Sequence, residues 1–375
     1  MAGKSCLLDF EKILFWQQLI LKSIGLDYYS SDFQYTPLTI FVLILVVVFM
    51  GVSLIDLYLF RSDIFNFTFV LVTFFYGVVG TTRIIVGLSK TKFCAKMIQE
   101  AKLTYQYASD SDQEQQVLWR TTKLLKQSTI SYSIIFIGGC LLAAFIPLAI
   151  YLWNGEKIFP FGTMVPLVDP TTPDGYQLTY MYQISCMLWA PVGLTASQNM
   201  YLALLFNICI QYDLLMVNLG DADRLIEANR DGALEQEIRG KLKQIVNSQQ
   251  RLSNFIAQIE NLFSVQIFVE VSSNALQIVV TLFVMNVEIW MPGYLLLLVS
   301  TFQLFLVCIL GTMIDIKSDQ FSERVYNIPW HKMRNSEQKM IRFMLESSQR
   351  SQRLTYGGMI PINMNLFLSV AGNRM

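Results

Sequence analysis

Long stretches without a charged residue are the feature that most constrains the fold of this chain. Six windows contain no Asp, Glu, Lys or Arg: 33–55, 64–82, 127–155, 175–212, 271–287 and 289–314. A helix needs roughly 20 mainly apolar residues to cross a hydrocarbon core of about 30 Å. Only 15% of the chain is charged, against roughly a quarter in soluble domains. We therefore expect an all-α polytopic membrane protein with six clear transmembrane helices.

The basic residues predict which side of the membrane each connection occupies. Of the 28 Lys and Arg residues, 24 fall on one side of the predicted spans and three on the other, while Arg83 lies inside the second span. Positive residues collect in short cytosolic connections. The richer side, which we assign to the cytosol, comprises the N-terminal segment and the connections 89–126, 211–264 and 315–353. The N-terminus is therefore expected to be cytosolic.

Two ionisable residues fall well inside the predicted spans, Arg83 in the second and Glu270 in the fifth. Intramembrane charges often mark ion or proton routes. Arg83 is near the inner end of its span, so we expect its side chain to reach the interface. Glu270 is expected to pair with a cytosolic base or to line a water-filled vestibule.

Three segments outside the spans have helical periodicity. Residues 7–24 predict an amphipathic helix at the inner membrane face. A heptad pattern from Ile238 to Phe263 leads without Gly or Pro into the fifth span, which predicts one helix of roughly 50 residues with long cytosolic extension. Residues 335–353 predict a second cytosolic amphipathic helix. The heptad seam could be covered by the same subunit, against spans four and six, or by another subunit.

The sequence lacks the residues that several kinds of chemistry require. His331 is the only histidine, which argues against His-based metal clusters and catalytic triads. No Gly-rich phosphate loop is present, and none of the six cysteines falls in a predicted outer loop. We expect no enzyme activity, no cofactor, no metal and no nucleic-acid partner.

Aromatic and methionine side chains are concentrated in the outer halves of the spans. Such a lining would suit small, volatile, mostly apolar ligands, because shape and dispersion decide binding where directional bonds are few. The same residue types also serve helix packing and membrane interfaces. The candidate ligand-binding residues are Phe74, Phe75, Tyr76, Phe145, Tyr151, Met181, Met187 and Phe283.

Several stretches together resemble the insect odorant receptor family. The outer loop contains Phe159-Pro160-Phe161-Gly162, followed by Pro166 and Asp169. The exit from span six contains Cys308, Gly311, Ser318, Tyr326 and Trp330, and the run Gly357–Val370 reads GGMIPINMNLFLSV. The resemblance covers essentially the whole chain, and this final run is its most specific part.

The resemblance implies a tetrameric, odorant-gated, non-selective cation channel in which a tuned subunit pairs with a shared odorant co-receptor subunit. It places the ligand pocket in the outer half, among spans two to five. It also places the contact between subunits at the cytosolic ends of spans four to six and the helix before span seven. The candidate subunit-contact residues are Leu252, Ile256, Ile259, Tyr326, Trp330, Ile341 and Leu345.

The end of the chain departs from the family pattern. Family members continue for roughly another twenty residues after Val370, whereas this chain ends at Met375. The mainly apolar run Met359–Ala371 contains only 13 residues, including Pro361, so we expect an incomplete seventh transmembrane segment. The expected parts are a cytosolic N-terminal segment with an amphipathic helix (1–36), a six-span bundle (37–314) with outer loop 153–178 and cytosolic loop 211–264, a cytosolic anchor helix region (315–358) and the incomplete seventh segment (359–375).

These patterns favour an odorant-binding tuning subunit of a heteromeric channel, in the plasma membrane of a sensory neuron dendrite. A gustatory receptor of the same superfamily and a non-conducting truncated isoform remain alternatives. A G-protein-coupled receptor would have an outer N-terminus and usually an outer disulfide, and the basic residues and cysteines argue against both. The sequence does not identify the odorant.

Overall fold

The computed structural model describes residues 2–30, 32–108, 111–166, 168–229, 233–349, 355–356 and 360–372. Within these ranges, six helices are long and apolar enough to cross a membrane, which confirms the predicted number of spans. They are α2 (Pro37–Leu59), α3 (Ile64–Ser89), α5 (Asp112–Asn154), α6 (Pro173–Ala228), α7 (Glu235–Val287) and α8 (Met291–Asn327).

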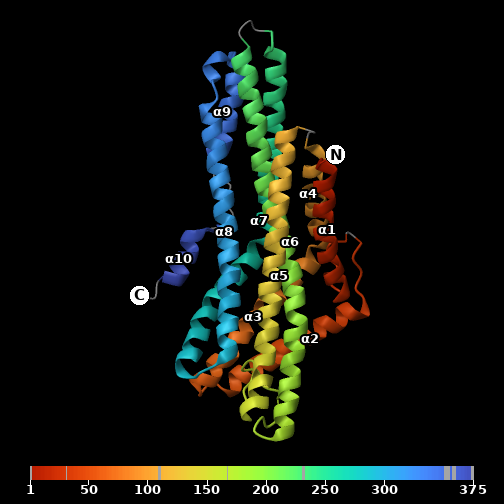
Figure 1. Cartoon of the computed structure of the whole chain (residues 1–375), viewed down its shortest axis with the longest axis vertical. Helices are drawn as coiled ribbons and strands as arrows, with labels where there is room; N and C mark the ends of the chain where they lie inside the picture. The colour runs from red at the N-terminus through yellow and green to blue at the C-terminus, as the bar shows by residue number, and fades with distance from the viewer. Residues whose placement is uncertain are drawn as a thin grey trace.

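The four longest helices, α5 to α8, form an elongated bundle (Figure 1). They run along the long axis, and the connection between α5 and α6 is at the bottom of the view. Helices α2 and α3 pack at this lower end, α2 against α3 and α3 against α7. Helices α6, α7 and α8 extend above the top of α5 in this view.

The continuous helix predicted from the heptad pattern is confirmed. Helix α7 has 53 residues, which at 1.5 Å per residue is about 80 Å. The seam residues Ile238, Leu242 and Ile245 are buried within the chain. In that region α7 packs against α6, α8 and α9 (Asn335–Gln349). Packing within the same chain therefore covers the seam.

The predicted N-terminal amphipathic helix forms as α1 (Ala2–Ser23), which packs along α4 (Thr91–Tyr107), α5 and α6 (Figure 1). Its place at the inner membrane face stays a prediction. Its buried face includes Phe10, whose ring stacks on Tyr105 at a centroid distance of 4.6 Å. The apolar face of α1 is buried against the protein, while Phe15 and Trp16 remain exposed on another face.

The C-terminal part of the described chain contains short elements. The strands β1 (Thr355–Tyr356) and β2 (Ile360–Pro361) pair antiparallel, and α10 (Met364–Gly372) follows. Helix α9 covers the described part of the predicted helix 335–353, because residues 350–353 lie outside the described ranges. Helix α10 has nine residues, or about 13 Å, and packs against α8 at one side of the bundle.

Candidate functional site

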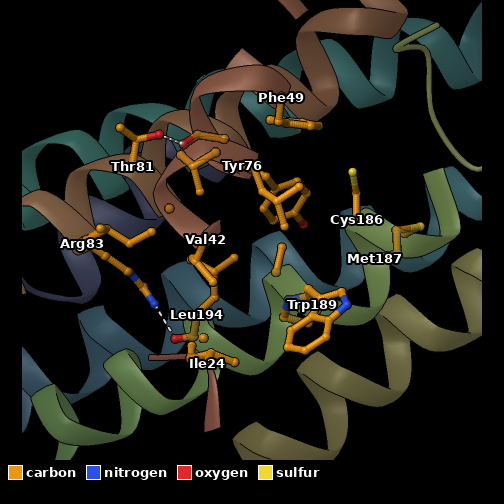
Figure 2. A pocket seen from close by; sticks show the side chains of 18 of the residues that line it. Ile24, Val42, Phe49, Tyr76, Thr81, Arg83, Cys186, Met187, Trp189 and Leu194 are labelled. Atoms are coloured by element: carbon orange, nitrogen blue, oxygen red, sulfur yellow. Dashed lines mark hydrogen bonds between the residues drawn. The ribbon is translucent and has the colours of Figure 1, made fainter. Parts of the chain in front are cut away.

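A cavity of about 450 Å³ lies between α2, α3 and α6 (Figure 2). This volume is within the range of pockets that bind small molecules. Its lining is mainly apolar and aromatic, with contributions from the end of α1, the connection to α2, two residues of α5, and single residues of the outer loop and α8. Residues labelled in Figure 2 are Ile24, Val42, Phe49, Tyr76, Thr81, Arg83, Cys186, Met187, Trp189 and Leu194.

Helical periodicity explains which residues face this cavity. On α3 the lining residues Thr73, Tyr76, Gly80 and Ile84 follow one another at intervals of three and four, so they form one face, and Gly77 lies beside Tyr76. At Gly80 an added Cβ would have only one neighbour within 4 Å, a Leu194 methyl at 3.8 Å, which leaves open space there.

One end of the cavity is covered by the loop between α5 and α6. Phe161 of this loop lines the cavity and is buried. The Gln183 amide nitrogen donates to the carbonyl oxygens of Phe161 and Thr163 at 3.0 and 2.8 Å. The backbone N–H of Met164 donates to Oδ2 of Asp56 at 2.8 Å.

The same loop lies directly against α3. At Gly162 an added Cβ would come 2.6 Å from the backbone carbon of Phe69 and 2.7 Å from the nitrogen of Val70. Glycine is therefore needed for this close approach. Trp290 donates from Nε1 to the carbonyl oxygen of Phe159 at 3.4 Å, which ties the loop to the start of α8 as well.

A buried ion pair lies at the other end of the cavity, where Arg83 lines it. Arg83 Nη2 is 2.8 Å from Glu270 Oε1, and both side chains are almost fully buried. Arg83 also donates to the carbonyl oxygen of Leu194 and the amide oxygen of Gln198, and Gln303 donates to Glu270. This cluster joins α3, α6, α7 and α8.

The surroundings that we expected for these two charged side chains were therefore wrong. Arg83 does not reach the interface, and Glu270 does not pair with a cytosolic base. The two residues neutralise each other inside the bundle, because each offers the other a buried partner of opposite charge. Pairing is the arrangement that makes a buried charge tolerable in a membrane span.

The eight candidate ligand-binding residues separate into three groups. Tyr76 and Met187 line the cavity, and the Tyr76 hydroxyl is 2.8 Å from the Ser300 hydroxyl. Phe74 and Phe75 are half-buried on α3 and do not line the cavity. Four are exposed at the bundle surface: Phe145, Tyr151, Met181 and Phe283. The structure thus brings only two of the eight into the cavity.

The candidate subunit-contact residues also separate. Leu252, Ile256, Ile259 and Ile341 are buried within the chain, and Leu345 is half-buried. Tyr326 and Trp330 are exposed, with 68% and 49% of their surface accessible. A contact between subunits stays a prediction, and among these seven residues only the two exposed ones present a largely free surface for it.

Several lining residues carried no signal in the sequence. The α2 side of the cavity, including Val42 and Phe49, comes from a span that is apolar over most of its length, where only a few polar residues mark the buried face. Ile24 and Tyr28 come from the α1–α2 connection. Phe161 was found only as part of the outer-loop resemblance. No group of three or more His, Cys, Asp or Glu suited to a metal ion occurs in the described ranges.

Comparison with protein families and known sequences gives consistent results. A family model described as 7tm Odorant receptor matches residues 63–375. Odorant receptor 83c of Drosophila melanogaster is 23% identical over 237 residues, covering 60% of this chain and 59% of the relative. Odorant receptor 10 of Aedes albopictus is 20% identical over 264 residues, covering 66% and 67%. The chain therefore aligns with less than two thirds of the Drosophila relative.

Comparison with solved structures shows the same fold over nearly the full length. The insect olfactory receptor OR5 of Machilis hrabei, in complex with eugenol, matches with a TM-score of 0.81 at 15% identity. A second structure of the same receptor matches with a TM-score of 0.78. Both matches cover 97% of this chain and 97% of the receptor chain.

Proposed function

Since this chain belongs to the seven-transmembrane odorant receptor family of insects, we propose that it is the odorant-binding tuning subunit of a heteromeric odorant-gated cation channel. The observation that carries this proposal is the apolar cavity between α2, α3 and α6. Its lining offers large apolar surfaces and few free polar groups. Its ligands would therefore be small apolar molecules, selected by shape and dispersion.

The assembly belongs to the same proposal. The partner would be a shared odorant co-receptor subunit in a heterotetramer, in the plasma membrane of a sensory neuron dendrite. The exposed aromatic residues Tyr326 and Trp330, at the cytosolic end of α8 and just beyond it, support a contact there. Aromatic side chains are enriched at interfaces between proteins.

Channel function is tested by recording odorant-evoked current in cells that express this chain with the co-receptor while G-protein signalling is blocked. Current that depends on both the odorant and this chain supports a channel subunit. Current that disappears when G-protein signalling is blocked would contradict the proposal. Responses restricted to tastants would favour a gustatory receptor.

The binding site is tested with two matched glycine variants. Gly80→Leu would extend a side chain into the cavity, whereas Gly51 lies on α2 with nothing within 4 Å of an added Cβ and does not line the cavity. We expect Gly80→Leu to abolish or shift the odorant response by at least about tenfold in effective concentration. Gly51→Leu should leave it unchanged. Equal responses in the two variants would place the ligand elsewhere.

A further inference from the structure

The cavity has one side that is made of exposed residues. On α2 the lining residues Leu38, Phe41, Leu45 and Val48 are all exposed. On α6 the facing residues Ser185, Trp189 and Ala190 line the same cavity and are exposed as well. Helices α2 and α6 both contain segments apolar enough to span the membrane. This side of the cavity therefore faces the hydrocarbon core of the bilayer rather than water.

The two ends of the cavity are closed. At the end covered by the loop, Phe161 is held by Gln183, and Gly162 leaves no space between the loop and α3. At the other end, the lining residues Leu21, Ile24 and Tyr28 are all buried. The Arg83–Glu270 pair lies beside them. The residues at both ends are therefore packed, in contrast to the exposed side between α2 and α6.

We propose that ligands reach this cavity laterally, from the bilayer through the opening between α2 and α6. The inference rests on the proposed function, because it takes the cavity as the odorant site, and it narrows the ligand class. Ligands must be uncharged and must partition into hydrocarbon before they bind. A charged molecule pays a large desolvation cost in the bilayer core, so it is excluded before it meets the cavity.

Lateral entry also assigns a role to the composition of the two rims. Apolar rim residues on α2 contact lipid as readily as they contact a ligand, so a ligand exchanges places with an acyl chain without uncovering polar groups. Trp189 marks the α6 rim, where Figure 2 shows its ring beside the helix, next to the turn that carries Cys186 and Met187. A bulky residue at the rim should therefore slow entry.

Cys186 provides a reporter for this route. It lines the cavity and is half-buried, whereas the other five free cysteines, Cys6, Cys94, Cys140, Cys209 and Cys308, are buried. The experiment compares two thiol reagents on the full chain in lipid nanodiscs, where both faces are accessible. One is the uncharged, bilayer-partitioning reagent pyrene maleimide, and the other is a sulfonate-bearing methanethiosulfonate. Cys186→Ser gives the background from the other cysteines.

We expect pyrene maleimide to label Cys186 at least about tenfold faster than the sulfonate reagent does, after each rate is normalised to its reaction with the denatured chain. Equal normalised rates, or faster reaction with the sulfonate reagent, would show an aqueous route and overturn the proposal. No labelling by either reagent even at about pH 9, where more of the thiol is ionised, would show a cavity closed on all sides and would also overturn it.

Two matched tryptophan variants locate the opening. Ala190 lines the cavity and is exposed, whereas Leu188 is exposed on α6 but does not line it. Ala190→Trp should slow labelling by pyrene maleimide several-fold, and Leu188→Trp should not. Equal rates would place the opening elsewhere. Labelling needs no odorant response, so failure of lateral entry is distinguishable from failure of the proposed function, which the glycine variants test separately.

Discussion

The ion pair between Arg83 and Glu270 connects the lining of the cavity to the rest of the bundle. Arg83 lines the cavity on α3, and Glu270 lies on α7, where Gln303 of α8 also donates to it. Removing one member of a buried ion pair leaves the other charge uncompensated, which costs about 3–5 kcal/mol. Replacing both members by neutral residues removes that penalty.

We therefore expect Arg83→Gln and Glu270→Gln each to lower the thermal unfolding temperature strongly, and the double variant to recover much of the loss. Fluorescence-detected size-exclusion chromatography of heated, detergent-solubilised protein would measure this. A double variant whose loss equals the sum of the two single losses would show that the residues act independently, contrary to the observed pair. The destabilised single variants should also reach the cell surface in smaller amounts.

Asp63 caps the N-terminus of α3 in the outer turn, just outside the span. Its Oδ1 accepts from the backbone N–H groups of Phe65 and Asn66, and its Oδ2 accepts from the Asn66 amide at 2.6 Å. The Asn66 side chain, followed by its backbone N–H, holds the pKa of the Asp63 carboxyl below its ordinary value. The pKa of Asp63 is lower in the folded chain than in the unfolded chain, so the ionised carboxylate stabilises the fold. This stabilisation is fully present above the ordinary carboxyl pKa and is lost as the pH falls through the folded pKa.

Asp63→Ala should accordingly lower the thermal unfolding temperature at about pH 7, and its difference from wild type should shrink towards about pH 3. Asp63→Asn, which keeps a capping oxygen, serves as the control and should show a smaller loss at neutral pH. A difference between wild type and Asp63→Ala that grows on acidification would contradict this assignment.

Gly311 determines how the C-terminal elements dock on α8. An added Cβ there would lie 1.8 Å from the carbonyl oxygen of Ile362. Met364 donates from its backbone nitrogen to the Thr312 hydroxyl at 2.9 Å, and Phe367 packs edge-on against Phe305. Gly311→Ala should therefore displace residues 360–372 from α8 while the remaining bundle stays folded.

Limited proteolysis of the solubilised protein would measure this displacement as faster cleavage near the C-terminus. Gly138→Ala is the matched control, since Gly138 lies on a membrane-spanning helix, α5, and nothing is within 4 Å of an added Cβ. Unchanged cleavage in Gly311→Ala, with an unchanged unfolding temperature, would mean that the docking does not depend on this close approach.

How much of the structure could be predicted from the sequence differs from one element to another, for physical reasons. The spans and the length of α7 could be predicted, because charge-free windows and a heptad repeat are properties of contiguous sequence. The cavity could be predicted only in part. Neighbouring aromatics such as Phe75 and Tyr76 point about 100° apart on a helix, so a cluster in sequence does not form one face. Arg83 and Glu270 are 187 positions apart, and their pairing depends on the packing of α3 on α7.

At the scale of the whole molecule, the remaining question is which surface receives a second subunit. Most of the predicted contact residues on α7 and α9 are already covered by their own chain. Exposed aromatic side chains remain at Tyr326, Trp330 and Phe343, around the C-terminal end of α8 and on α9. Such a group of exposed aromatics is what a protein interface would bury.

The double variant Tyr326→Ser/Trp330→Ser should therefore reduce assembly with the co-receptor while the chain itself stays folded. Both side chains are exposed, so their removal leaves no cavity in the core and should change the unfolding temperature of the isolated chain little. Co-purification with a tagged co-receptor should fall at least about tenfold, since truncated interface aromatics commonly cost about 2 kcal/mol or more each. Trp119→Ser is the matched control, because Trp119 is an exposed aromatic on the cytosolic part of α5. Unreduced co-purification of the double variant would move the contact to another surface.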